Sequence, residues 1–138
     1  MSDTGFQKKL RIITMDDEEM IRDIVRAMLN KLGHETFPAK DGEEALGIYK
    51  KAMEDNAPID LTIMDLTVPQ GMGGKEAVQR LLKIDPKAKV VVFSGYSNDP
   101  VMADWKAYGF CAALEKPCRF EDFTDLMNRF VDKNSEHA

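Results

Sequence analysis

The chain has 138 residues, 43% hydrophobic and 31% charged, with a formal net charge of -5 and a pI of about 5.1. That length fits one domain whose core needs no disulfide or metal to hold it together. The acidic balance, without a basic run, predicts no direct binding to nucleic acid. The two cysteines, Cys111 and Cys118, are too far apart for a CxxC motif and are expected to be reduced, so we expect a cytoplasmic protein. No apolar stretch is long enough to span a bilayer, and no signal-peptide pattern begins the chain.

Strand and helix patterns alternate along the whole chain. Apolar residues spaced three and four apart predict the helices, and short runs rich in β-branched residues predict the strands. Gly33 and Gly109 suit helix ends, and Asp99-Pro100 suits a helix start. In chain order we expect strand 10–15, helix 21–32, strand 34–39, helix 42–53, strand 59–65, helix 77–82, strand 90–93, helix 100–108, strand 110–114 and helix 120–131.

This alternation predicts an α/β domain with a parallel sheet covered by helices on both faces. The runs 61–64 and 90–93 are almost wholly apolar, which is typical of central parallel strands buried on both sides. We expect the domain to cover residues 10–131, between polar tails at 1–9 and 132–138. In such sheets ligands bind beyond the carboxyl ends of the strands, so the residues that follow the strands are the first candidates for a site.

Polar residues of a particular kind follow four of the predicted strands. Asp16 and Asp17 come after the first, Asp65 ends the third, Ser94 follows the fourth and Lys116 follows the fifth. Two carboxylates about 4 Å apart repel by roughly 4 kcal/mol at an effective dielectric constant near 20. Three clustered carboxylates therefore need a cation or must protonate. An acidic site made of oxygen ligands suits Mg²⁺.

Such a set of groups meets the needs of phosphoryl transfer to a carboxylate. An aspartate can act as the nucleophile and form an acyl phosphate, while Mg²⁺ and Lys116 neutralise the transferring group and Ser94 hydrogen-bonds to it. Taken singly, each residue also fits a plain turn, helix cap or solvated side chain. Their joint placement at one edge, each after a different strand, favours a functional site.

At this point the sequence resembles the receiver domain of two-component response regulators over about residues 10 to 131. The resemblance implies a flavodoxin-like three-layer sandwich, with a five-stranded parallel sheet in the order 2-1-3-4-5 and five helices on both faces. The motifs that carry it are Met15-Asp16-Asp17-Glu18, Asp65-Leu66-Thr67-Val68-Pro69, Ser94-Gly95 and Lys116-Pro117.

The resemblance also implies a role for each of these residues. Asp65 is the expected phosphoacceptor, Ser94 the switch hydroxyl and Lys116 the phosphate-binding lysine. Asp16, Asp17 and Asp65, with the backbone carbonyl of Thr67, are the expected Mg²⁺ ligands. The expected phosphodonor is a phosphohistidine on a sensor histidine kinase or a histidine phosphotransfer protein. The domain is thus expected to be a regulatory phosphoacceptor rather than an enzyme.

Two features depart from the usual receiver pattern. Receivers carry an aromatic residue three positions before the lysine, where this chain has Ala113. The loop after Pro69 is one residue longer and richer in glycine. These features resemble the receivers appended to hybrid sensor histidine kinases. The chain is therefore interpreted either as such a C-terminal receiver or as a stand-alone relay protein.

Three other functions compete with this interpretation. Loss of the aromatic residue suits a receiver-like interaction module that works without phosphorylation, although retention of the five polar site residues argues against it. An aspartyl-nucleophile phosphatase places its nucleophile in a D-x-D motif after the first strand, whereas Asp16 and Asp17 are adjacent. A flavin carrier needs a loop rich in glycine and hydroxyl groups there, and this chain has acids.

Residues outside this set also lead to expectations. Met20 and Ala27 lie seven positions apart, beside the apolar stripe of the first helix, and are expected to form a small docking patch for the histidine-bearing helix of a partner. His34 is expected at the surface. Cys111 is expected to be a small buried strand residue.

Overall fold

The computed structural model describes residues 9–96 and 98–136, which form a three-layer α/β sandwich. Its sheet has five parallel strands in the order β2-β1-β3-β4-β5, which confirms the fold expected from the sequence. All five residues of β3 and of β4 are buried, as expected for central strands. The strands are β1 (Arg11–Met15), β2 (Glu35–Ala39), β3 (Leu61–Asp65), β4 (Val90–Ser94) and β5 (Ala112–Glu115).

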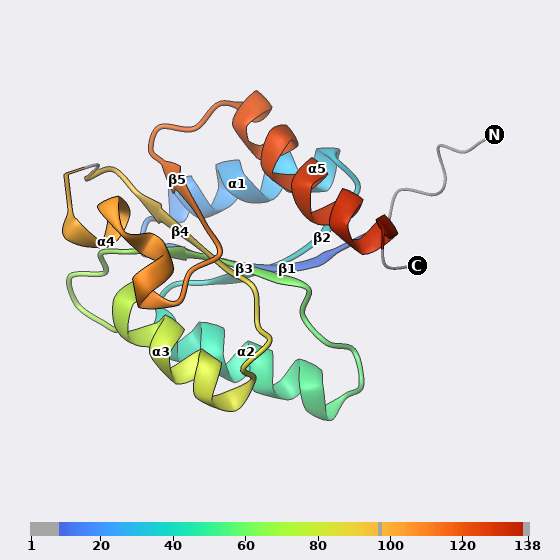
Figure 1. The fold of residues 1–138 in the computed structure, drawn as a ribbon, viewed down its shortest axis with the longest axis horizontal. Helices are drawn as coiled ribbons and strands as arrows, with labels where there is room; N and C mark the ends of the chain where they lie inside the picture. Colours follow the sequence, from blue (N-terminus) through green and yellow to red (C-terminus); the bar gives the residue numbers. More distant parts are fainter. Residues whose placement is uncertain (1–8, 97, 137–138) are drawn as a thin grey trace.

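The helices divide between the two faces of the sheet, as Figure 1 shows. α1 and α5 cover one face, and α2 and α3 cover the other, with α4 and a short 3-10 helix, η2, beside α3. Among the described residues no helix has both the length and the apolarity to cross a membrane. The helices are α1 (Glu19–Lys31), α2 (Gly42–Glu54), α3 (Gly74–Ile84), α4 (Pro100–Ala103), η2 (Trp105–Tyr108) and α5 (Phe120–Glu136).

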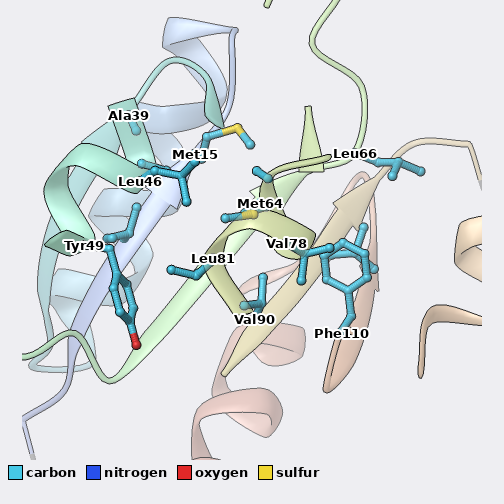
Figure 2. Close-up of a cluster of buried hydrophobic side chains, with 14 of the residues drawn as sticks. Met15, Ala39, Leu46, Tyr49, Met64, Leu66, Val78, Leu81, Val90 and Phe110 are labelled. Atoms are coloured by element: carbon cyan, nitrogen blue, oxygen red, sulfur yellow. The ribbon is translucent and has the colours of Figure 1, made fainter. Parts of the chain in front are cut away.

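The sheet separates two apolar cores, because successive side chains of a strand point to opposite faces. Met15 of β1 and Met64 of β3 belong to the α2–α3 core, where Figure 2 shows them close to Leu81 of α3. Ile12 and Ile63 belong to the α1–α5 core on the other face. Residues at the ends of β1, β3 and β4 are thus fixed by packing from both sides.

Three helices begin or end at glycine or aspartate residues of the kind that favours helix ends. The chain leaves α1 through Gly33, whose φ of +94° is accessible to glycine at little cost. The side chain of Asp41 accepts a hydrogen bond from the N–H of Glu44 and caps α2. The side chain of Asp99 accepts one from the N–H of Val101 and caps α4.

Three helices differ clearly from their expected extent, and one of them, α3, runs from Gly74 to Ile84 and exceeds the expected 77–82 at both ends. The predicted helix 100–108 is divided into α4 and η2, because Asp104 leaves the helical region with φ -139° and ψ 52°. This break lets Trp105 and Tyr108 pack against the α2–α3 core together with Val101. α5 continues to Glu136, past the expected end at 131, because neither glycine nor proline follows to stop it. Residues 1–8 of the expected N-terminal tail lie outside the described part of the chain.

The expectations for His34 and Cys111 were wrong. His34 is 7% exposed, because its Nδ1 atom accepts a hydrogen bond from the backbone N–H of Leu10 just before β1. A histidine in that role must be neutral, and burial lowers its pKa, although the nearby charge of Asp60 acts in the opposite direction. Cys111 is exposed, because β5 begins one residue after it.

The glycine-rich loop before α3 folds back onto the end of β3. A Cβ atom on Gly73 would lie 2.5 Å from the carbonyl oxygen of Leu66, and one on Gly74 would lie 2.9 Å from that of Asp65. Side chains larger than hydrogen cannot be accommodated there unless the backbone moves. The loop therefore packs closely against the chain segment that leaves the sheet at Asp65 and restricts its movement.

Replacement of Gly73 by alanine is expected to lower the free energy of unfolding by roughly 1–3 kcal/mol, because the methyl group must displace the Leu66 carbonyl. Gly47 lies on the exposed side of α2, and a methyl group added to it would meet no atom within 4 Å. Gly47→Ala should therefore raise stability by about 0.5–1 kcal/mol through helix propensity. Urea unfolding measures both variants, and a Gly73→Ala protein as stable as the wild type would contradict the close approach.

Protonation of His34 is expected to weaken the fold at low pH. The pKa of His34 is lower in the folded protein than its ordinary value of 6.5, so its stabilising contribution is complete above that value and is lost as the pH falls below it. In His34→Ala the free energy of unfolding should be lower near neutral pH and should change less between about pH 7.5 and about pH 5.5. Urea unfolding at the two pH values tests this, and an equal pH dependence in both proteins would refute it.

Candidate functional site

The polar residues predicted from the strand ends meet at one edge of the sheet. Asp16 directly follows β1, Asp65 and Ser94 are the last residues of β3 and β4, and Lys116 directly follows β5. Backbone hydrogen bonds fix this arrangement: the N–H of Lys116 donates to the carbonyl of Ser94 at 2.8 Å, and that of Asp16 to the carbonyl of Ala39 at 3.0 Å. The site is therefore held by the sheet ladder and not by a loop.

Three carboxylates form the acidic part of the site. Asp16, Asp17 and Asp65 each place an oxygen atom within 4.8 Å of the other two. Asp16 and Asp65 are buried, whereas Asp17 is exposed at the mouth of the site. The side chain of Arg22 in α1 donates to the backbone carbonyl of Asp16 at 2.7 Å and so ties this helix to the acidic residues.

Lys116 supplies the positive charge that faces these acids. Its Nζ atom lies 2.7 Å from Oδ2 of Asp16 and 3.3 Å from Oδ1 of Asp65. The same ammonium group lies over the ring of Phe93, 5.1 Å from its centre. The lysine thus reaches two buried carboxylates at once, and the aromatic ring limits where its charge can move.

The charges in the site are not balanced. Burial is the main reason that the pKa of Asp65 rises to about 7, and the negative charge of Asp16 raises it further, while Lys116 and the N–H of Thr67 oppose the rise. Burial acts to lower the pKa of Lys116, but its interactions with Asp16 and Asp65 outweigh that effect and raise it. The two buried carboxylates thus need more positive charge than one ammonium group provides.

A divalent cation would supply the positive charge that the buried carboxylates lack. Asp16 Oδ2 is buried and accepts no well-aligned hydrogen bond from the described residues, although the ammonium of Lys116 is close to it. A buried oxygen with free lone pairs, next to two further carboxylates, is the donor set that Mg²⁺ prefers. The residues present therefore match the magnesium site expected from the sequence.

Ser94 and Thr67 lie beside the acids but interact with the backbone. The buried hydroxyl oxygen of Ser94 accepts a hydrogen bond from the N–H of Tyr96 at 3.0 Å. The N–H of Thr67 donates to Oδ1 of Asp65 at 3.4 Å, while its carbonyl oxygen stays a predicted metal ligand. The structure thus gathers all six predicted residues in one region. Arg22 and Phe93 were not predicted, because neither stands in a motif.

Comparison with known proteins places the chain in a family. The family model described as response regulator receiver domain matches residues 12–128. Sporulation initiation phosphotransferase F of Bacillus subtilis is 28% identical over 125 residues, which cover 91% of this chain and 96% of the relative. The receiver domain of NtrX from Brucella abortus is 30% identical with a TM-score of 0.76, covering 88% of this chain and 98% of that structure.

A longer relative matches over a small part of its own length. The autoinducer 1 sensor kinase/phosphatase LuxN of Vibrio harveyi is 29% identical over 124 residues, which are 90% of this chain but 14% of LuxN. The family match reaches all five strands and includes every strand-end residue of the acidic site. The chain therefore belongs to the response regulator receiver domain family and serves as a regulatory phosphoacceptor in two-component signal transduction.

Proposed function

We propose that Asp65 is the phosphoacceptor and that it takes its phosphoryl group from a phosphohistidine. The donor is a sensor histidine kinase or a histidine phosphotransfer protein. The observation that carries this proposal is the cluster of three carboxylates within 4.8 Å of one another, with Lys116 contacting two of them. Asp16, Asp17 and Asp65, together with the Thr67 carbonyl, would hold Mg²⁺.

The proposed step moves one phosphoryl group between two side chains. A carboxylate oxygen of Asp65 attacks phosphorus, the phosphorus–nitrogen bond breaks, and the imidazole of the donor leaves with the electron pair. Lys116 neutralises negative charge on the transferring oxygens, and the Ser94 hydroxyl donates a hydrogen bond to one of them. Mg²⁺ held by Asp16, Asp17 and Asp65 would supply further positive charge for the transfer. The protein contributes position and charge, since each group is already fixed by the sheet.

The proposal also concerns whether the domain acts alone or is attached to a sensor histidine kinase. Relatives of two kinds match this chain, sporulation initiation phosphotransferase F over 96% of its own length and the sensor kinase/phosphatase LuxN over 14% of its own length. We therefore propose either a stand-alone relay protein or a receiver attached to a sensor histidine kinase. Both contexts supply a phosphohistidine donor, and both suit a protein in the cytoplasm. In either context the domain assists its own phosphorylation and dephosphorylation, but it is not a conventional enzyme. We propose residues 10–131 as the domain that does this.

A groove beside the acidic site supports a docking surface for the donor. The exposed side chain of Met20 (72%) lies on α1 with Ala27, as the sequence pattern suggested. Ile24, which the sequence pattern placed on the apolar stripe facing the core, is 44% exposed and lies in the same patch. Next to them a groove of about 350 Å³ runs between α1 and α5 and reaches Lys116. Burial raises the pKa of the Cys118 thiol to about 11, so this group is neutral in the groove. The residues that line it include Ile21, Ile24, Met28, Pro117, Cys118 and Phe123.

This placement suits a helix that carries a phosphohistidine. Its apolar face would cover Met20 and Ile24 while its histidine reached the carboxylates beyond the end of β1. The surface and the acidic site lie at the same end of α1, so one rigid helix can contact both. We therefore assign this α1–α5 surface to the donor.

Incubation with acetyl phosphate and Mg²⁺ is expected to add one phosphoryl group to the protein, detected by intact mass. Asp65→Asn should take none, because an amide is not a nucleophile at this centre. Asp125→Asn, which alters an exposed carboxylate on α5, is the matched control and should be labelled like the wild type. No adduct on wild type and no Mg²⁺ binding by calorimetry would contradict the proposal and favour an interaction module that works without phosphate.

Met20→Glu is expected to slow phosphotransfer from a phosphohistidine donor protein by about tenfold, because it buries a charge in the apolar contact. Labelling by acetyl phosphate should be unchanged, since the acidic site itself is intact. Met53→Glu on α2, where the methionine is 41% exposed, controls for an added surface charge. Equal transfer rates in Met20→Glu and wild type, followed by rapid-quench gel electrophoresis, would remove α1 from the docking surface.

A further inference from the structure

The ring of Phe93 lies beside the acidic site, although the proposed transfer gives it no part. Phe93 stands opposite Asp65 in the pairing of β3 with β4, so both side chains point to the α1–α5 face of the sheet. The ammonium group of Lys116 lies over this ring, with Nζ 5.1 Å from its centre. A neutral aromatic ring thus contacts the cationic group that faces both buried acids.

Packing fixes the orientation of this ring. Phe93 is 4% exposed and meets the ring of Phe123 in α5 edge to face, with the ring centres 6.0 Å apart and an interplanar angle of 74°. Phe123 is buried in turn. The backbone carbonyl of Phe93 accepts a hydrogen bond from the N–H of Leu66 at 3.1 Å. The face that Phe93 presents to Lys116 is therefore held by the core and by the sheet.

The ammonium group of Lys116 gains from a support of this kind, because its four-carbon stem is flexible. It lies closer to Asp16, at 2.7 Å, than to Asp65, at 3.3 Å. Each of these contacts joins it to a single oxygen atom, and they must adjust when the ammonium turns to phosphoryl oxygens on Asp65. The attraction to a ring face is spread over the whole ring and requires no lone pair. The ring therefore keeps the charge in place while the ammonium exchanges one oxygen partner for another.

We infer that Phe93 is a positioning residue for phosphoryl transfer, because its ring holds the ammonium of Lys116 near Asp65 through a cation–π interaction. This inference rests on the proposed phosphorylation of Asp65. Only 18% of the Lys116 side chain is exposed, so little water competes with the ring for the ammonium. A charge that is already in place requires little reorganisation when negative charge develops on the transferring oxygens. Phe93 thus acts through Lys116 and does not touch the reacting atoms.

Fluorine atoms on the ring test this role with little change in its shape. Fluorine withdraws electron density from the ring face and weakens its attraction for a cation, while the ring stays apolar. Phenylalanine with one, two or three fluorine atoms is placed at position 93 by nonsense suppression. Labelling by acetyl phosphate and Mg²⁺, followed by intact mass, should slow stepwise, by about five- to tenfold with three fluorine atoms. The same series at Phe110, which is buried in the α2–α3 core, is the matched control and should label at the wild-type rate.

Two further measurements separate this role from simple packing. In Lys116→Gln, which labels slowly and has no charge to hold, three fluorine atoms on Phe93 should cause no further slowing, because the two changes remove the same interaction. In wild type the ring current of Phe93 should shift the proton NMR signals of the ε-methylene group of Lys116 upfield. Phe93→Leu keeps an apolar side chain but lacks the ring, so it should lose this shift and label about tenfold more slowly.

Several outcomes would overturn the inference. An adduct that forms at the wild-type rate throughout the fluorinated series at Phe93 would do so and would leave the proposed function intact. Equal slowing by three fluorine atoms in wild type and in Lys116→Gln would give the ring a purely structural part. The fluorinated series decides the question if circular dichroism shows that Phe93→Leu is unfolded. A wild type that takes no adduct at all would overturn the proposed function and this inference with it.

Discussion

Two buried carboxylates share one ammonium group at the end of this sheet, and the rest of the site depends on that shortage of positive charge. Lys116 contacts both Asp16 and Asp65, yet the pKa of Asp65 still rises to about 7 because burial and its acidic neighbour prevail. Such a site gains free energy from any added cation. Under the proposed function, that cation would also offset the negative charge of a phosphoryl group on Asp65.

The sheet makes this unfavourable cluster possible. Asp16, Asp65 and Ser94 stand at the ends of strands whose side chains pack into cores on both faces, so their backbone positions are fixed by apolar burial far from the charges. The free energy that holds the acids together therefore comes from hydrophobic packing and the strand ladder. The close approach of Gly73 to Leu66 adds a brace on the chain that follows Asp65.

Much of this arrangement could be predicted from the sequence, because strand ends are marked by abrupt changes from apolar to polar residues. Asp65 and Ser94 stand directly after such runs, and parallel topology then places them at one edge. The break at Asp104 was not predictable in the same way, since the apolar spacing from Val101 to Tyr108 fits one continuous helix. It arises from packing against the α2–α3 core, which local spacing does not encode.

His34 and Arg22 show the same limit for single polar residues. His34 is buried because one ring nitrogen meets the N–H of Leu10, a contact between positions 24 apart in the chain. Arg22 lies on α1 among other charged residues, and only the folded chain shows that it reaches the carbonyl of Asp16. Hydrogen bonds of this kind leave no periodic trace in a sequence, whereas strands and amphipathic helices do.

The division of the apolar interior into two cores has a consequence for how such a domain can diversify. The proposed donor surface belongs to the layer of α1 and α5, and α4 and η2 belong to the opposite layer. Substitutions in separate layers share few neighbours, so their effects on stability should add with little coupling. Substitutions on the proposed donor surface can therefore accumulate without disturbing the packing of the opposite layer, and the reverse, while the acidic site between them is kept.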